Sequence, residues 1–304
     1  MNNSVIVLRK IKGLIKKPSL MFNVLGNRGF FNWMDDKTYL KILFKVKMNS
    51  KLDLDNPKTF NEKLQWLKLY DRNPSYCKMV DKYEAKKYVS SIIGEQYIIK
   101  TLGVWDKFED INFDDLPQSF VIKCTHDSGG VVICSDKKSF DYKSAKRKLN
   151  KSLKRNFYWS QREWPYKNVS RRIICEEFLR DSKHDVLTDY KFYCFDGIPR
   201  VVMINSDRGS KTTKADYFDM DYNLLDFTWG YPHADKIPDK PINFELMKDL
   251  AKKLSQNLKH IRIDFYEVNG KVYFGELTFY DGSGFQPIIP KEWDYKLGGF
   301  ISVP

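Results

Sequence analysis

The C-terminal part of this 304-residue chain places the strongest constraint on its fold. It contains two strand-like runs, His260–Tyr266 and Lys271–Phe279, joined through Asn269-Gly270. Asn-Gly between two such runs is a strong signal for a tight antiparallel hairpin. Successive side chains of a strand point to opposite faces of the sheet, so Arg262 and Asp264 share one face while apolar residues cover the other. The sequence therefore predicts a C-terminal hairpin with one charged face.

The position of Glu276 relative to Asp264 depends on the length of the turn. With a two-residue turn at Asn269-Gly270, Asp264 lies opposite Gly275, and Glu276 points away. With a three-residue loop, which adds Val268 and needs a left-handed Gly270, both carboxylates share one face. Such a face suits a magnesium–phosphate site, because Mg²⁺ takes one or two carboxylates plus phosphate oxygens. The spacing alone favours a solvated face with an ordinary Arg–Asp pair.

A second informative pattern is a strand, a glycine-containing loop and another strand. Phe120–Cys124 is followed by the loop Thr125–Gly130 and then by Val131–Cys134. Lys123 supplies a point charge before the loop, and the glycines let backbone amides approach phosphate oxygens. The Walker pattern G-x-x-x-x-G-K-[ST] is absent from the sequence. Taken alone, the pattern fits a plain hairpin turn better than a phosphate site.

Other apolar patterns predict further helices and strands. Thr59 and Glu62 have the spacing of a capping box and open a helix, and a second helix is expected from about Tyr76 to Ile93. The remaining expected elements are a helix over about 143–155, strands at Arg172–Phe178, Tyr190–Phe195 and Arg200–Asn205, and a helix over about Phe244–Gln256. Helices and strands alternate and strands then cluster, which indicates an α+β or mixed α/β fold with antiparallel sheets.

The chain has 52 Lys and Arg against 39 Asp and Glu, a net charge of +13, which favours anionic partners. Residues 1–50 are basic. Leu8, Ile11, Leu14 and Ile15 fall on one helical face among lysines, which predicts either a helix lying on an anionic membrane or a short packed terminal helix. No apolar run approaches the roughly 18 residues of a membrane span, and the N-terminal charges follow the apolar run instead of preceding it. We therefore expect a cytoplasmic protein.

The five cysteines form no C-x-x-C pair, and four of them lie in strand-like apolar runs. This pattern predicts buried free thiols and argues against a zinc site. The absence of G-x-S-x-G and H-E-x-x-H argues against common hydrolases and zincins.

Residues 141–172 contain eleven Lys and Arg, two acids and interleaved aromatic residues. Basic and aromatic side chains together suit single-stranded nucleic acid and suit acidic sugars equally well. A solvated helix followed by a folded-back aromatic loop explains the same composition.

Several phrases in order along the chain resemble the ATP-grasp superfamily, and most closely its TupA-like branch of teichuronopeptide and surface-polysaccharide biosynthesis. The phrases are FNEKLQWLKLYDRNP, VDKYEAKKYV, FVIKCTHDSGGVVIC, REWPYKN, DYKFYCFDG, RIDFYEVNGKVYFGELTFYDGSGF and EWDYKLG, over about residues 55–300. The resemblance implies an α+β ATP-grasp fold in which two lobes with antiparallel sheets clamp a nucleotide. It implies a basic helical extension over 1–55, a lobe over 56–178 with the glycine loop, and a lobe over 179–304 with the metal site.

The resemblance also implies roles for individual residues. Arg262 is similar to the transition-state arginine, and Lys191 to a basic residue that reaches the phosphates. The residues implied for nucleotide binding are Lys82, Lys123, His126, Asp127, Ser128, Gly129, Gly130, Glu176, Glu177, Phe178, Leu179, Asp189 and Lys191. The implied metal ligands are Asp264, Glu276 and Thr278, where Thr278 stands in place of the asparagine usual in the superfamily.

The activity implied by the resemblance is an ATP- and Mg²⁺-dependent carboxylate–amine ligase that acts through an acyl phosphate. The expected substrates are an acidic sugar or polysaccharide, such as a uronic acid, and an amino acid or another amine, in bacterial capsule or surface-polysaccharide biosynthesis. Contact of residues 1–20 with the inner face of the membrane is one of the two interpretations of the N-terminus. We expect no nucleic-acid partner.

Three alternatives stay open from the sequence. A glycosyltransferase often needs a D-x-D metal motif, and Asp219-Met220-Asp221 and Asp53-Leu54-Asp55 match it, although both have the character of surface turns. A kinase acting on a hydroxyl could use the same fold. A non-enzymatic module for anionic polymers could use residues 1–20 and 141–172.

Overall fold

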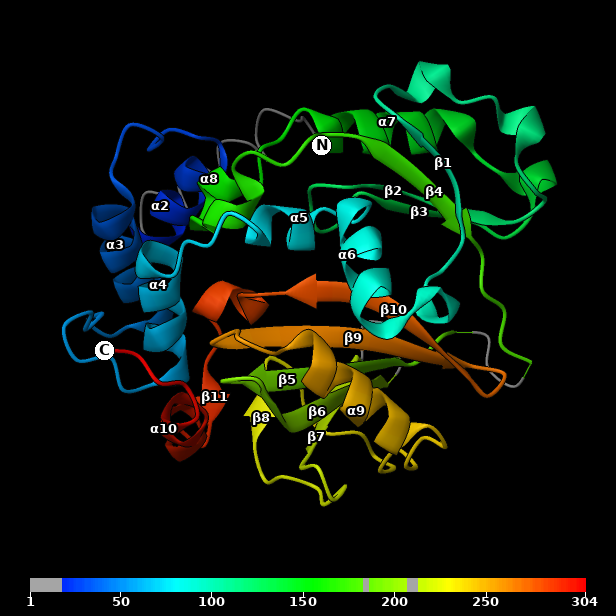
Figure 1. Cartoon of the computed structure of the whole chain (residues 1–304). Coiled ribbons are helices and arrows are strands. Elements are labelled where there is room, and N and C mark those ends of the chain that lie inside the picture. Colours follow the sequence, from blue (N-terminus) through cyan, green and yellow to red (C-terminus); the bar gives the residue numbers. More distant parts are fainter. Residues whose placement is uncertain (1–17, 183–185, 207–212) are drawn as a thin grey trace.

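The computed structural model describes residues 18–182, 186–206 and 213–304. Its strands form a four-stranded, a five-stranded and a two-stranded sheet, and every ladder within them is antiparallel. Figure 1 shows the four-stranded sheet with helix α7 above the five-stranded sheet. The predicted α+β class with antiparallel sheets is confirmed.

The small sheet has the strand order β1-β4-β2-β3 and carries one helix on its outer face. Its strands are β1 (Thr101–Trp105), β2 (Phe120–Cys124), β3 (Val131–Cys134) and β4 (Ile173–Glu177), and the helix is α7 (Tyr142–Leu153). Phe120, Ile122 and Cys124 alternate with less buried residues and pack with Leu149 of α7. The intervening positions of β2, which include Lys123, face the opposite side.

The large sheet has the order β10-β9-β5-β6-β7. Its strands are β5 (Asp189–Phe195), β6 (Ile198–Ser206), β7 (Lys214–Phe218), β9 (His260–Val268) and β10 (Lys271–Thr278), and β8 (Thr228–Trp229) pairs separately with β11 (Ile288–Ile289). Helix α9 (Phe244–Leu254) packs its apolar stripe against the sheet, with the rings of Phe244 and Phe192 5.7 Å apart. Ile263 and Phe265 lie in the same core, so Arg262 and Asp264, which alternate with them, face away from it.

The predicted helix opened by Thr59 is α4 (Phe60–Tyr70), and its capping box is present. The second predicted helix is different, because the structure divides it into α5 (Tyr76–Val80) and α6 (Glu84–Ile93). Asp81 explains the break: its Oδ1 accepts from the backbone N–H groups of Tyr83 and Glu84, which starts α6 afresh. Its Oδ2 accepts from Arg172. The break turns Lys82 out of the helix.

The N-terminal region contributes α2 (Pro18–Asn27) and α3 (Asp36–Met48), and the remaining helices are α8 (Tyr158–Gln161) and α10 (Glu292–Gly299). Leu40, Leu43 and Phe44 of α3 form a separate buried cluster together with Phe285. The amphipathic segment expected from Leu8 to Ile15 lies outside the described residues.

Two hydrophobic clusters, one on each of the larger sheets, divide most of the buried residues between them. Buried residues between 108 and 175 form the cluster of the small sheet, whereas Phe60 to Ile93 pack in the same cluster as the large sheet. The boundaries at 55/56 and 178/179 stay a prediction. Cys124, Cys134, Cys175 and Cys194 are buried and unpaired, as expected, and Cys77 is partly exposed. Within the described residues, no helix is long and apolar enough to span a membrane.

Candidate active site

The β9–β10 hairpin combines features of the two geometries considered for it. The turn has two residues: Val268 pairs with Lys271, and Asn269 and Gly270 have φ of 50° and 75°. A register shift between Phe274 and Glu276 then leaves Gly275 as a bulge, so Glu276 pairs with Asp264. The turn length alone would have separated the carboxylates, and the bulge brings them together.

A side chain at the bulge would make close contacts with the opposing strand. A Cβ at Gly275 would lie 3.1 Å from the backbone oxygen of Asp264 and 3.1 Å from the ring of Tyr266. Contacts this short force the neighbouring atoms to move, and both belong to the opposing strand. The glycine therefore maintains the register that pairs the two carboxylates.

Arg262 connects the acids of this face. Its Nε lies 2.7 Å from Asp264 Oδ1, its Nη2 lies 2.7 Å from Glu276 Oε1, and its Nη1 contacts Asp281 Oδ1. Lys191 is the register partner of Asp264 on β5, and its Nζ lies 2.5 Å from Asp264 Oδ2. Arg262 and Asp264 are 8% and 2% exposed, whereas the side chain of Glu276 is 42% exposed.

The cations keep the carboxylates ionised. Burial raises the pKa of Glu276, but the positive charges of Arg262, Lys82 and Lys191 outweigh it and lower the pKa to about 2. Burial likewise raises the pKa of Asp281, and Arg262 with a hydrogen bond from Tyr193 lowers it below its ordinary value. Both groups are therefore anionic at neutral pH.

The oxygen atoms of this face fit a magnesium ion. Asp264 and Glu276 supply paired carboxylates, and Thr278 Oγ1 lies 3.3 Å from Glu276 Oε1. Among the described residues no group of three or more His, Cys, Asp or Glu side chains could hold a metal ion. A cation here would draw further ligands from phosphate oxygens and water, as Mg²⁺ does. The metal role of these residues stays a prediction.

Lys82, in the break between α5 and α6, and the glycine loop of the four-stranded sheet approach the same site. Lys82 Nζ donates to the backbone oxygen of Asp127 at 2.5 Å, and Lys82, Ser128, Arg262 and Glu276 all line one cavity of about 400 Å³. Burial lowers the pKa of Lys82, and the negative charge of Glu276 opposes that effect. The break after α5 thus presents a lysine to the predicted phosphate site.

Two side chains of the glycine loop point away from this cavity and toward α7. His126 contacts Ser152 O at 3.2 Å, and Asp127 accepts from Ser152 Oγ, so both side chains face α7 and anchor the loop. Gly129 has φ of 121°, and a Cβ there would meet nothing within 4 Å. The backbone from Ser128 to Gly130, and not the two anchoring side chains, is what this loop offers to a ligand.

A second cluster lies on the inner face of the small sheet. Glu176 is 3% exposed and forms ion pairs with Lys123 at 2.5 Å and Lys86 at 2.6 Å. Burial raises the pKa of Glu176, but the two lysines outweigh it and lower the pKa. Lys86 lies in the phrase VDKYEAKKYV, but no sequence pattern distinguishes it from the neighbouring Lys87.

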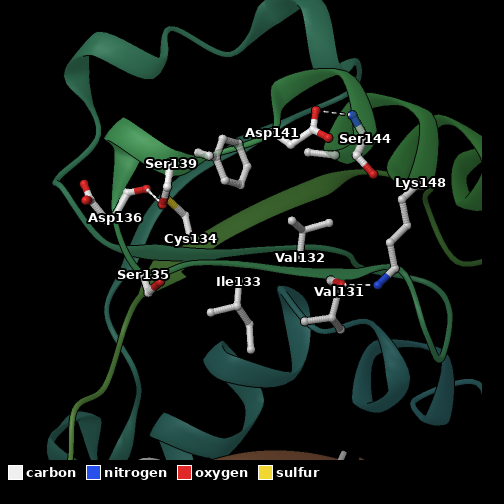
Figure 2. A pocket seen from close by; sticks show the side chains of 12 residues that line it. Val131, Val132, Ile133, Cys134, Ser135, Asp136, Ser139, Asp141, Ser144 and Lys148 are labelled. Atoms are coloured by element: carbon white, nitrogen blue, oxygen red, sulfur yellow. Dashed lines mark hydrogen bonds between the residues drawn. The ribbon is translucent and has the colours of Figure 1, made fainter.

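An exposed apolar side chain lies on the face of the small sheet that carries Glu176. Val121 pairs with both Glu176 and Ile133, and the Ile133 side chain is 61% exposed. Figure 2 shows Ile133 pointing to the side of β3 opposite Val132, away from α7. Exposure of a large apolar side chain on the face that carries Glu176 is consistent with the predicted adenine position.

The other residues implied for the nucleotide follow from these strands. Glu177, Phe178 and Leu179 continue from β4, and Glu177 is exposed. Asp189 opens β5, is 2% exposed and lies 3.8 Å from Lys191 Nζ.

The cavity in Figure 2, about 570 Å³, lies between β3 and α7 and is lined by none of the residues implied for nucleotide or metal.

The glycosyltransferase alternative loses the support of its two sequence motifs. Asp219 Oδ1 accepts from the N–H groups of Asp221 and Asn223, and Asp53 Oδ1 accepts from those of Asp55 and Asn56. Each D-x-D match is therefore a local turn.

The aromatic segment after α7 folds back on the N-terminal helices. Arg162 is fully buried, with its guanidinium 4.3 Å from the ring of Tyr39, and Tyr158 donates to Asp36. This favours the folded-back interpretation over an open stacking surface for nucleic acid.

A protein-family model described as TupA-like ATPgrasp matches residues 62–302, most of the chain. The chain belongs to the TupA-like ATP-grasp family. The predicted family and the ATP-grasp fold are thereby confirmed. A comparison with curated proteins finds no match.

Solved structures similar to this TupA-like ATP-grasp chain include three ligases or synthetases. D-alanine–D-alanine ligase from Bacillus anthracis is 18% identical, with a TM-score of 0.37 over 66% of this chain and 57% of that chain. N5-carboxyaminoimidazole synthetase from Staphylococcus aureus is 13% identical, with a TM-score of 0.38 over 75% and 53%. The ATP-grasp ligase PsnB with a phosphomimetic variant of its minimal precursor, Mg and ADP is 10% identical, with a TM-score of 0.43 over 90% and 72%. The chain thus spans little more than half of the first two, and likeness at this level carries no substrate to it.

Proposed function

We propose that the protein is an ATP- and Mg²⁺-dependent carboxylate–amine ligase. The observation that carries the proposal is the pairing of Asp264 with Glu276 across the Gly275 bulge, beside Arg262 and in the cavity that Lys82 lines. Membership of the TupA-like ATP-grasp family supports the same chemistry.

The residues would divide the work by charge. Phosphoryl transfer depends mainly on positioning and on neutralising phosphate charge. Lys82, Lys123 and Lys191 would meet the phosphates, and Arg262 would stabilise the charge that develops during transfer. Mg²⁺, when bound, would neutralise the charge on phosphate oxygens, and Asp264, Glu276 and Thr278 would hold it.

The base and ribose would lie on the small sheet and at its edge. Glu176 and the backbone of Glu177 to Leu179 would face the adenine, with Asp189 toward the ribose. The backbone of Ser128 to Gly130 would cover the phosphates, while His126 and Asp127 hold that loop on α7. We propose that lobes 56–178 and 179–304 enclose the nucleotide, with residues 1–55 as an added extension.

The substrate class follows from charge and from the family. In this proposal the carboxylate is a uronic acid of a bacterial capsule or surface polysaccharide, or its precursor, and the amine is an amino acid. The net charge of +13 suits both ATP and an acidic glycan. The reaction would take place in the cytoplasm or at the inner face of the membrane, with residues 1–20 as the contact.

Trapping with hydroxylamine tests the reaction class, since hydroxylamine converts an acyl phosphate to a hydroxamate and does not do so with a phosphate ester. With ATP, Mg²⁺ and D-glucuronic acid, a ligase gives hydroxamate and ADP. ADP with a phosphorylated sugar and no hydroxamate would instead indicate a hydroxyl-directed kinase. Thermal stabilisation by UDP-sugars, with none by ATP analogues, would indicate a glycosyltransferase.

A further inference from the structure

The cavity that contains Arg262 and Glu276 has a second end, which the proposed nucleotide and metal residues do not account for. It is lined by Lys47, Gln161, Glu163, Ser283, Phe285 and Gln286. These residues come from α3, from the end of α8 and the loop that follows it, and from the turn after β10, three segments far apart in the sequence. Glu163 belongs to the phrase REWPYKN and Ser283 to YDGSGF, so two phrases without a function so far meet here.

Glu163 is a buried carboxylate with unused hydrogen-bonding capacity. It is 4% exposed, and its Oε1 accepts from Ser283 Oγ. No described residue donates to Oε2. Burial raises the pKa of Glu163, and the positive charge of Lys68 opposes this. A carboxylate oxygen without a protein donor on the wall of a cavity can accept a hydrogen bond from water or from a ligand.

Lys68 fixes the backbone near this carboxylate and has no hydrogen left for a ligand. It is fully buried, and its Nζ donates to Gln65 Oε1 at 2.9 Å, to Gln161 O at 3.0 Å and to Ser283 O at 2.8 Å. These three bonds use all three hydrogens of the ammonium. Lys68 therefore joins the backbone of Gln161, two residues before Glu163, to the backbone of Ser283.

The turn that carries Ser283 has an unusual backbone conformation, which places the Ser283 hydroxyl next to Glu163. Gly282, Ser283 and Gly284 have φ of 53°, 54° and 64°, and a serine in the left-handed region is unusual. The bonds from Lys68 and Gln65 to the carbonyls of this turn hold it there. The result is a hydroxyl aimed at Glu163.

Lys47 places the opposite charge on the same cavity. Its Nζ donates to Gln161 Oε1 at 2.8 Å and lies 5.1 Å from the centre of the Phe285 ring. Two hydrogens of the ammonium remain for other acceptors. Burial lowers the pKa of Lys47, and the negative charge of Glu163 opposes this, which is consistent with both groups facing one space.

We propose that this end of the cavity binds the amine substrate as an α-amino acid. Glu163 Oε2 accepts from its ammonium group, Lys47 pairs with its carboxylate, and Phe285 forms the wall beside them. The inference rests on the proposed ligase function, because it places the second substrate next to the site where the carboxylate would be activated. An acidic sugar alone would bring no ammonium group to Glu163 Oε2.

Saturation-transfer NMR on the full chain tests the inference without turnover. The sample contains the twenty amino acids, D-glucuronic acid, Mg²⁺ and a non-hydrolysable ATP analogue. The variants are Glu163→Gln and Lys47→Met, and Lys45→Met is the matched control, because Lys45 is exposed on the same helix.

We expect transfer to at least one amino acid with the wild type and with Lys45→Met. Because a charge-assisted hydrogen bond is worth about 1.5–3 kcal/mol, affinity should fall at least about tenfold in Glu163→Gln and Lys47→Met. No amino-acid signal with the wild type, unchanged signals in both variants, or loss of the glucuronate signal instead would overturn the assignment. The signal of the ATP analogue tests the proposed function separately. If it is absent with the wild type, the proposed nucleotide site is contradicted, whereas the amino-acid result is unaffected.

Discussion

Glu276 lies directly across from Asp264 because Gly275 bulges out of the ladder between β9 and β10. A hairpin with a regular two-residue turn places two such residues on opposite faces, so the single extra residue decides whether the carboxylates can act together. Arg262 then contacts both of them, at 2.7 Å each.

Replacing Gly275 by alanine should disturb this pairing. The new Cβ would lie 3.1 Å from the Asp264 backbone oxygen, so we expect the free energy of unfolding to fall by about 1–3 kcal/mol. Urea denaturation measures the change. Gly299→Ala is the control, because a Cβ there meets nothing within 4 Å. Equal stability of the Gly275→Ala and Gly299→Ala variants would show that the bulge does not need glycine.

Lys86→Met should destabilise the contact between α6 and the small sheet, where Lys86 pairs with Glu176. Glu176 is 3% exposed and would keep only Lys123 as its cationic partner. Removing one partner from a buried ion pair usually costs about 3–5 kcal/mol, and the remaining lysine should reduce this to about 2 kcal/mol. Thermal or urea unfolding gives the value. Lys87→Met, with a side chain 64% exposed, should change stability by less than about 0.5 kcal/mol, and a similar loss in both variants would contradict the assignment.

His260 should make stability depend on pH. Burial lowers its pKa from 6.5 to about 4, and Nδ1 contacts Cys194 O at 2.9 Å. The folded protein therefore favours the neutral ring, and the unfolded chain binds the proton more readily between these values. The contribution is complete above about pH 6.5 and is lost as the pH falls through 4, for a total of roughly 3 kcal/mol.

Urea unfolding of the wild type and of His260→Phe between pH 4 and 7 measures this contribution. The substitution keeps an aromatic ring beside Phe60 and Phe195 and removes the titrating group. We expect the pH slope to become smaller in the variant. Identical slopes would show that His260 titrates alike in the folded and unfolded states.

The sequence was sufficient for elements whose signals are local. The capping box of Thr59 and Glu62, the strands on either side of the glycine loop and the Asn-Gly turn all depend on neighbours in the chain, and each is present. The charged face of β9 followed from alternation alone.

The rest depended on contacts between distant residues. The bulge at Gly275 compensates for a turn that by itself gives the wrong face. An isolated glycine in a strand is a local sign of a bulge, but it does not fix the register that results. The break at Asp81 needs Arg172 from another segment. Lys47 and Phe285 meet only because α3 packs beside the turn after β10.

The central claim is tested by thermal unfolding with a non-hydrolysable ATP analogue, with and without Mg²⁺. The proteins compared are the wild type, Glu276→Gln and the exposed control Glu245→Gln. The paired carboxylates should make the stabilisation of the wild type and of Glu245→Gln larger with Mg²⁺ than without it, and Glu276→Gln should lose that difference while remaining folded. An undiminished Mg²⁺ effect in Glu276→Gln, or no stabilisation of the wild type by the analogue, would contradict a magnesium–nucleotide site at Asp264 and Glu276.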